Sequence, residues 1–236
     1  MELHPKYIDL SLSRLEKLLQ KLGNPHFDLP PTIHFAGTNG KGSTLSFLSN
    51  ILVNNNYSVH SYTSPHLTNF TERININNNQ INTNKLYNSL KYVKNINANN
   101  PITFFEITTA AAFLLFAKYK ADFLLLETGL GGRLDATNII PKKLLSIITS
   151  ISFDHEEFLG KSINKIIIEK LGITKSSKKI IIAKQEKKVN EIILKKLKKT
   201  KNVIYFNKDF NFTTKKNNKF LFKFGDFKKI IPKPKL

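Results

Sequence analysis

With 236 residues, of which 41% are hydrophobic, the chain is long enough for one sizeable domain and too apolar to be disordered. It has no cysteine, which excludes disulfides and thiol chemistry, and it shows neither an apolar leader nor a membrane-spanning apolar run, so we expect a cytoplasmic protein with no membrane partner. Its formal net charge of +20 comes from an excess of lysine. Asparagine and isoleucine are abundant as well, and this composition is typical of A+T-rich coding sequence. We therefore expect the positive charge to attract small anionic substrates rather than nucleic acid.

The hydrophobic pattern predicts helices that alternate with strands. A leucine repeat over residues 12–22 predicts a first helix, which Gly23-Asn24-Pro25 would end. Strands are predicted at residues 32–36, 58–62, 123–126, 144–149, 180–183 and 203–206, and helices at 43–54, 85–94, 105–119, 163–171 and 189–197. Segments 73–76 and 80–81 predict a small hairpin, and segments 210–213 and 220–224 predict a β-hairpin region near the C-terminus. This alternation indicates an α/β fold, with a mostly parallel sheet and helices on both faces, in a single domain over residues 1–236.

The strand at residues 32–36 runs into a glycine-rich loop that carries a lysine, and a helix follows. That order of parts suits a nucleotide phosphate, because glycines let backbone N–H groups surround phosphate oxygens and the helix directs its positive end at them. Lys41 would supply a mobile charge, and Ser43 or Thr44 a hydroxyl near the metal that accompanies ATP. The usual P-loop spacing fails twice, since Phe35 replaces the first glycine and Gly42 follows the lysine. We interpret the segment as a variant phosphate loop.

Other polar residues also follow predicted strands. The loop at residues 63–66, Glu127 and the pair Asp154-His155 each come directly after one. Because ligands of parallel sheets bind beyond the carboxyl ends of the strands, we expect these residues to meet the phosphate loop at one edge. Glu127 is then a candidate Mg²⁺ ligand, although a solvated strand end has the same pattern. His155 fits a ligand, an acid–base group or one half of a capping pair.

The pattern leaves several further residues open. Ser64 lies in a Ser-Pro-His turn, and Arg133 and Asp135 suit either a structural pair or a substrate contact. Glu106 follows two phenylalanines at a helix start, where it would complement the helix dipole. Lys170 has the pattern of an ordinary solvated helix lysine. Periodicity alone assigns a function to none of them.

Six motifs taken together resemble one family. They are HFAGTNGKGST (34–44), YTSPHL (62–67) with FTERI (70–74), TFFE (103–106), ETGLGGRLDATN (127–138), SFDHEEFLG (152–160) and EKLGITK (169–175). Their order and spacing resemble the folylpolyglutamate synthase/dihydrofolate synthase family, which belongs to the Mur-ligase-like, ATP-dependent amide ligases. The opening segment 3–25 is similar to the N-terminal segment of that family, and the resemblance weakens after about Lys184.

The resemblance implies a Mur-ligase central-domain-like fold and a reaction in two steps. ATP phosphorylates a substrate carboxylate, and the amine of L-glutamate then attacks the acyl phosphate to form an amide. Lys41, Lys170 and His155 are the implied catalytic residues, and Lys170 matches a lysine that CO₂ carbamylates so that it helps to organise a second metal. Mg²⁺ is implied at two sites, with Ser64, Glu127 and His155 matching family ligands. The implied ATP-phosphate residues are Thr38, Asn39, Gly40, Lys41, Gly42 and Ser43.

The same resemblance implies the substrates. The expected partners are dihydropteroate or a reduced folate, L-glutamate and ATP, bound by a monomer that takes no nucleic acid. Phe105 would offer a ring face to the pterin, and Asp135 a polar contact. The implied substrate residues are Asp9, Leu10, Ser11, Thr103, Phe104, Phe105, Glu106, Leu134, Asp135 and Ala136.

The chain also departs from the family. Thr128 stands where the family usually has valine, and Leu171, beside Lys170, where it usually has alanine. Family members are nearly twice as long, and the remainder includes the end of the ATPase domain and a C-terminal Rossmann-like domain that contacts ATP and glutamate. We therefore expect an incomplete N-terminal ATPase domain without the C-terminal glutamate-ligase domain, and weak or no ligase activity of these residues alone. The sequence would then be a fragment, one part of a split gene with a separately encoded C-terminal domain, or a decaying remnant.

Three alternatives stay open at this point. The first is an inactive or split-enzyme ATP-binding fragment of such a ligase. The second is a basic nucleic-acid binder, although no RNA-binding aromatic signature accompanies the lysines. The third is a ligase of the same superfamily with another substrate, such as a cell-wall precursor, which the resemblance of TFFE and GLGGRLDATN disfavours.

Overall fold

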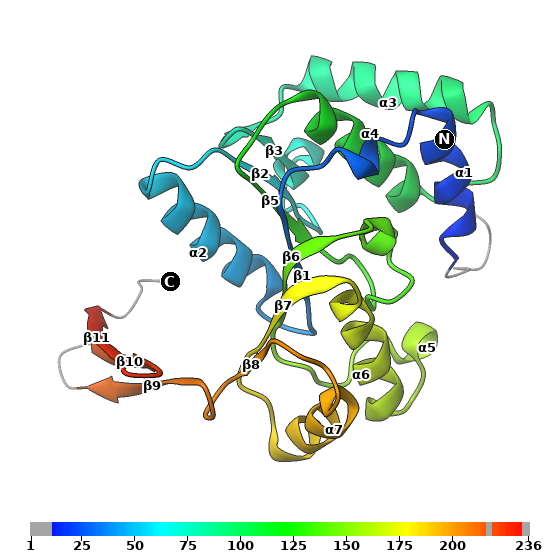
Figure 1. The fold of residues 1–236 in the computed structure, drawn as a ribbon. Coiled ribbons are helices and arrows are strands. Elements are labelled where there is room, and N and C mark those ends of the chain that lie inside the picture. The colour runs from blue at the N-terminus through cyan, green and yellow to red at the C-terminus, as the bar shows by residue number, and fades with distance from the viewer. Residues whose placement is uncertain (1–10, 216–218, 233–236) are drawn as a thin grey trace.

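The computed structural model describes residues 11–215 and 219–232, and its centre is an eight-stranded sheet (Figure 1). The strand order is β4-β3-β2-β5-β1-β6-β7-β8. Strands β2, β5, β1, β6, β7 and β8 pair in parallel, and β3 and β4 add an antiparallel hairpin at one edge, so the expected mostly parallel sheet is confirmed. The bounds are β1 (Thr32–Ala36), β2 (Val59–Tyr62), β3 (Ile74–Ile76), β4 (Asn79–Gln80), β5 (Phe123–Glu127), β6 (Lys143–Ile148), β7 (Ser177–Ile182) and β8 (Val203–Tyr205).

Helices cover both faces of this sheet, as the alternating side chains of its strands require (Figure 1). Ile33 and Phe35 of β1 pack in one cluster with Leu45 of α2, whereas Ala36 packs on the opposite face with α6 and α7. The half of that second face near β2 and β5 is covered by α1, α3 and α4. The helices are α1 (Ser13–Lys21), α2 (Lys41–Asn54), α3 (Thr83–Asn97), α4 (Phe104–Lys118), α5 (Glu156–Leu159), α6 (Ile163–Leu171) and α7 (Lys187–Leu197).

The helix α2 begins two residues earlier than its hydrophobic pattern predicts. Gly40 precedes it with φ of 81°, a left-handed conformation that glycine adopts without strain. The loop can therefore turn directly into the helix at Lys41, so that the first helical residue is the lysine of the loop.

The C-terminal part of the described chain forms three strands, where the sequence predicted a two-stranded hairpin. These are β9 (Phe210–Lys215), β10 (Lys219–Phe224) and β11 (Phe227–Pro232), which form a separate antiparallel sheet. A two-residue turn at Gly225, with φ of 54°, returns β10 into β11. The third strand escaped the prediction because Lys228, Lys229 and a final proline obscure its alternation. No helix in the described ranges is long and apolar enough to cross a membrane.

The glycine-rich turn at residues 129–132 lies directly against α6. A Cβ atom on Gly132 would stand 2.6 Å from the Glu169 carbonyl oxygen and 3.1 Å from the Lys170 Cα. The backbone N–H of Arg133 donates to that same carbonyl at 2.7 Å, and the Arg133 side chain forms an ion pair with Glu169 at 2.9 Å. This close backbone contact holds α6, and with it Lys170, beside the end of β5.

We predict that Gly132→Ala lowers the free energy of unfolding by about 1–3 kcal/mol, because the new methyl group meets backbone atoms that cannot move aside. Urea denaturation measures this change. Gly42→Ala is the control for stability, since its Cβ would meet only Glu127 oxygens at ordinary distances of 3.6 and 3.7 Å. Equal stability of Gly132→Ala and the wild type would contradict the proposed close contact.

Candidate active site

The loop that leaves β1 is held by the segment that follows β6. The backbone N–H groups of Thr38 and Asn39 donate to the Ser150 carbonyl at 2.7 and 3.4 Å. The Thr38 hydroxyl donates to the Ser152 carbonyl at 3.0 Å and accepts from the Ser152 N–H at 3.1 Å. These contacts cross between neighbouring strand ends, so the predicted phosphate loop lies at the carboxyl edge of the sheet and has a defined shape.

Two lysines converge on the carbonyl of Gly37, the first residue of this loop. Lys41 Nζ donates to it at 3.1 Å and Lys170 Nζ at 3.0 Å. Only glycine fits at position 37, because a Cβ atom there would stand 1.9 Å from the Thr149 hydroxyl oxygen. Lys170 is only 2% exposed, and its nearest carboxylate is Asp154, 4.0 Å away. Burial, followed by the charge of Lys41, lowers the pKa of Lys170 to about 8, and Asp154 opposes this shift.

The N-terminus of α2 faces the same loop and carries no acidic residue in its first turn. Its positive end is therefore not neutralised by the helix itself, as an anion site requires. The Thr44 hydroxyl donates to the Gly40 carbonyl at 2.6 Å, whereas the exposed Ser43 hydroxyl makes no hydrogen bond with any described residue. Of the two hydroxyls that the sequence offered, Ser43 is the one available to a ligand.

Glu127 ends β5 directly beside this helix. It is 4% exposed, and its Oε2 accepts a hydrogen bond from the backbone N–H of Ser64 at 3.2 Å. Burial raises its pKa, against the effects of the Ser64 hydrogen bond and the Lys41 charge. Among the described residues no basic side chain lies within 4.0 Å of this carboxylate. A buried carboxylate of this kind, beside the backbone of Ser64, suits a hard cation.

His155 is placed differently from the other two predicted metal ligands. It precedes α5 with φ of 47°, its side chain is 48% exposed, and its Nε2 lies 3.4 Å from Asp154 Oδ1. No hydrogen bond or ion pair links it to Ser64 or Glu127, and the described part of the chain contains no group of three His, Cys, Asp or Glu residues that could hold a metal. The donors present thus fit an Mg²⁺ ion that takes most of its ligands from phosphate and water.

Several of the predicted substrate residues lie at the starts of α1 and α4. Thr103 caps α4 in a reciprocal capping box with Glu106. The Glu106 carboxylate is 5% exposed and also accepts a hydrogen bond from Arg14 Nε at 3.3 Å, which ties α4 to α1. Ser11 lies just ahead of α1, where its hydroxyl meets that of Ser13 at 2.8 Å. The remaining N-terminal predictions, Asp9 and Leu10, lie outside the described residues.

The two phenylalanines of the TFFE motif point to different neighbours. Phe105 stacks on Tyr62, with ring centroids 5.9 Å apart, and covers Gly129, where a Cβ atom would stand 2.6 Å from the ring. Phe104 is 41% exposed and meets Phe70 edge to face at 5.4 Å. Phe105 therefore connects α4 to the glycine-rich turn, while Phe104 keeps an open ring face.

Asp135 fastens that turn from the other side. Its Oδ2 accepts from the backbone N–H groups of Gly129 and Leu130 at 2.9 and 2.8 Å, and its Oδ1 accepts from the N–H and the hydroxyl of Thr137. These bonds occupy the lone-pair positions of a carboxylate that is 4% exposed, and burial raises its pKa. Its predicted neighbours Leu134 and Ala136 lie half-buried and buried, respectively, on the same segment.

His34 extends this network into the sheet. Because the Thr137 hydroxyl donates to Asp135, it accepts from His34 Nε2, 2.8 Å away, which assigns the proton of the imidazole to Nε2. Burial, with the charge of Lys143, holds the pKa of His34 well below its ordinary value, so the ring is neutral. Neither His34 nor Thr137 was singled out by the sequence, since one histidine in a strand and one threonine after it carry no signal of their contact.

Gln185 is a third residue that the sequence did not reveal. Its Nε2 donates to the Thr149 carbonyl at 2.8 Å, and its Oε1 accepts from the Ile151 N–H at 2.9 Å. It thereby braces the segment on which the phosphate loop rests.

The chain was also compared with known proteins. Residues 35–230 match the family model of the Mur ligase middle domain. Dihydrofolate synthetase of Saccharomyces cerevisiae is 44% identical over 170 residues, which cover 70% of this chain and 40% of the yeast protein. Dihydrofolate synthase/folylpolyglutamate synthase of Bacillus subtilis is 41% identical over 189 residues, with coverages of 77% and 44%. The chain therefore spans less than half of the length of these relatives.

Solved structures agree with this grouping. E. coli FolC in complex with DHPP and ADP superposes with a TM-score of 0.84 at 31% identity, over 96% of this chain and 54% of that one. The apo form of L. casei FPGS gives a TM-score of 0.87 at 28% identity, over 96% and 58%. The expected fold is thus confirmed by independent structures.

For the buried network we predict that Thr137→Val lowers the free energy of unfolding by about 1–3 kcal/mol. The valine leaves His34 Nε2 and one position of Asp135 Oδ1 buried without a partner. Thr137→Ser retains the hydroxyl and should cost clearly less. Chemical denaturation of both variants checks this, and equal losses would show that the hydroxyl does not join His34 to Asp135.

Proposed function

The chain belongs to the Mur ligase family, and on this premise we propose that it carries the ATP-binding part of a ligase that joins L-glutamate to dihydropteroate, to a folyl-glutamate or to both. Support comes from relatives named dihydrofolate synthase/folylpolyglutamate synthase and from structures that contain ADP, DHPP or folate. The observation that carries the proposal is the convergence of Lys41 and Lys170 on the Gly37 carbonyl, beside the free N-terminus of α2.

The geometry answers the main physical difficulty of such a reaction. A polyphosphate and a carboxylate repel one another, so a site that joins them must supply positive charge where they meet. In our proposal the loop from Thr38 to Ser43 binds the phosphates of ATP through the backbone N–H groups that the Ser150 carbonyl does not occupy, and Lys41 neutralises the phosphate charge. The substrate carboxylate takes the γ-phosphoryl group, ADP leaves, and the glutamate amine displaces phosphate to form the amide.

Magnesium would be held beside the loop, at Glu127, whose carboxylate oxygens lie next to Gly42. Glu127 and the Ser64 hydroxyl supply hard oxygen ligands in the proposed site, and the bound ion would neutralise developing phosphate charge. His155 is proposed for a second ion, next to Asp154. Both acidic residues lie on strand-end segments that meet at the carboxyl edge of the sheet.

We assign Lys170 a carbamate in the active protein. The neutral amine attacks CO₂, an N–C bond forms, and one proton is released, so that a cation becomes an anion. Burial favours this exchange because it lowers the pKa of Lys170 to about 8 and so increases the neutral fraction. The resulting carbamate would lie near Asp154, whose Oδ2 is 4.0 Å from the Lys170 nitrogen, and a bound cation can bridge two such like charges.

The substrate pocket is proposed at the junction of three segments. The Arg14–Glu106 contact joins α1, which Ser11 precedes, to the Thr103–Glu106 start of α4. The Phe105 ring lies on Gly129, whose N–H donates to Asp135 in the 134–136 segment. We further propose that residues 1–236 form the N-terminal ATPase domain, that the protein acts as a monomer, and that a glutamate-ligase domain works with it, in the same or in a separate polypeptide.

We expect Lys41→Ala to weaken binding of Mg-ATP by about tenfold or more, because a lysine-to-phosphate contact in a partly buried site is lost. Isothermal titration with a non-hydrolysable ATP analogue measures this. Lys91→Ala, an exposed lysine of α3, is the control and should bind as the wild type does. An unchanged affinity of Lys41→Ala for the ATP analogue would contradict the assignment of this segment as a phosphate loop.

The reaction is tested by ADP release with Mg-ATP, L-glutamate and either dihydropteroate or a reduced folate. The assay is run with the 236-residue chain alone and with the C-terminal half of a relative added as a separate polypeptide. A substrate-dependent amide product in either mixture supports the proposal, and the preferred acceptor names the activity. Absence of the product in both mixtures, with ATP bound, would overturn the assignment as a ligase.

For Lys170 we predict a ¹³C-carbamate resonance when the protein is given ¹³C-bicarbonate. Its intensity should rise between pH 7 and 9, since the reactive neutral amine increases as pH passes the lysine pKa of about 8. Lys170→Met should abolish the resonance, whereas Lys178→Met, an exposed lysine of β7, should preserve it. A signal that survives in Lys170→Met would place the carbamate elsewhere.

A further inference from the structure

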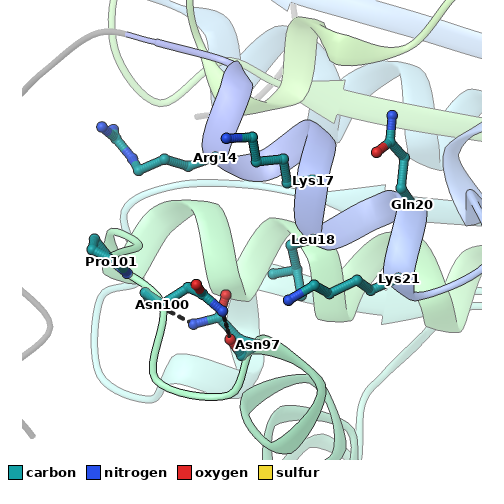
Figure 2. A pocket seen from close by; sticks show the side chains of 8 residues that line it. All are labelled: Arg14, Lys17, Leu18, Gln20, Lys21, Asn97, Asn100 and Pro101. Carbon is teal, nitrogen blue, oxygen red and sulfur yellow. Dashed lines mark hydrogen bonds between the residues drawn. The ribbon is translucent and has the colours of Figure 1, made fainter.

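A cavity of about 670 Å³ lies between α1 and the connection from α3 to α4 (Figure 2). It is separate from the phosphate loop and is of the size that small ligands occupy. Leu18 forms part of its wall from α1, and Pro101 from the connection. The residues that line it are Arg14, Lys17, Leu18, Gln20, Lys21, Asn97, Asn100 and Pro101.

The cationic residues of this cavity share one stripe of α1. Arg14, Lys17 and Lys21 are spaced at i, i+3 and i+7, which places them on one face of a helix. Figure 2 shows their side chains extending to the same side of α1, with Lys21 reaching toward Asn97 and Asn100. Seven residues of helix span about 10.5 Å, so the backbone positions of the three cationic residues form a stripe longer than one small anion. A ligand that engages the whole stripe must carry several anionic groups.

The charge of this stripe is not balanced by its own surroundings. Glu106 forms an ion pair with Arg14 at 3.3 Å, at one end of the cavity. Within residues 11–215 and 219–232, no carboxylate lies within 4.0 Å of the ammonium group of Lys17 or Lys21. Glu16 is the acidic residue of α1 but occupies another face of the helix. The cavity therefore presents at least two ammonium groups without a described counter-ion.

The opposite wall adds a second chemical requirement. Asn97 Nδ2 donates to the Asn100 carbonyl at 2.7 Å, and Asn100 Nδ2 donates back to the Asn97 carbonyl. This reciprocal pair uses an amide donor of each side chain, and no described donor contacts either Oδ1. Amide oxygens accept hydrogen bonds, so this wall favours a ligand that has N–H groups as well as negative charge. Inorganic phosphates have no N–H group to donate to these amide oxygens.

We propose that this cavity binds a short oligocarboxylate with amide N–H groups, that is, a glutamate oligomer. Successive carboxylates would meet the ammonium groups of α1, and the intervening amide N–H groups would donate to the asparagine wall. The proposal rests on the cavity alone. A γ-linked oligomer would further connect it with the proposed ligase, whereas an α-linked one would indicate an acidic segment of another protein.

The test measures binding of tetra-γ-glutamate and tetra-α-glutamate to the 236-residue chain by isothermal titration, at low salt and then at 0.15 M. Inorganic triphosphate is the comparison ligand, and a non-hydrolysable ATP analogue is kept saturating so that the phosphate loop is occupied. Lys17→Gln/Lys21→Gln should weaken oligomer binding by about tenfold, since two exposed ionic contacts are lost. The matched control is Lys188→Gln/Lys195→Gln, which removes the same charge from exposed positions of α7.

Binding of either tetraglutamate that is lost in the cavity variant and kept in the control supports the proposal. The oligomer that binds more tightly identifies the source of the ligand, either a γ-linked oligomer or an acidic segment of another protein. Equal weakening in both variants would overturn it, because general positive charge would then explain the affinity. Triphosphate binding to the cavity as tightly as the oligomers would also overturn it, as would absence of oligomer binding at millimolar concentration. Thermal unfolding of each variant confirms that the fold is retained. None of these readouts depends on ligase turnover.

Discussion

The close approach of the Thr149 side chain to the backbone of Gly37 is the constraint on which the rest of the site depends. This glycine follows the central strand β1, and the Thr149 hydroxyl occupies the space that any side chain would need. Its carbonyl accepts hydrogen bonds from two lysines, one in the following helix and one 133 residues further along the chain. Because β1 is buried on both faces, the position of this carbonyl is set by the whole sheet.

Near the end of β5, the loops are held together by glycines that allow close contacts and by buried polar groups. Gly129 lies under the Phe105 ring, and Gly132 lies on the backbone of α6. Asp135 then closes the turn, because both of its carboxylate oxygens accept hydrogen bonds. The Thr137 hydroxyl, which donates to Asp135, also accepts a hydrogen bond from His34 in β1. The paired groups of Asp135 and Thr137 favour one arrangement of the loops they join, whereas the buried His34 Nδ1 has no hydrogen-bond partner among the described residues.

Charge is distributed in a way that suits anionic ligands at more than one place. At the phosphate loop, Lys41 and Lys170 stand against the positive end of α2, and Glu127 is the buried carboxylate across from them. On α1, a separate stripe of basic residues faces an asparagine wall. The lysine excess of the chain accounts for the abundance of positive charge, but only the packing of helices decides where it is enclosed.

The sequence by itself determined the order and type of the elements, the phosphate loop and the residues that end β5 and β6. These features depend on local periodicity and on the positions of glycines, and both can be read from residues that are neighbours in the sequence. Family motifs also indicated Lys170, whose role, like those of Ser64 and His155, stays a prediction. Tertiary structure alone decided that Lys170 meets Gly37, that His34 is joined to Asp135, that His155 turns toward Asp154, and that a third strand completes the C-terminal sheet. Each of these results from contacts or pairings whose geometry arises only when the chain packs, and no local pattern encodes that geometry.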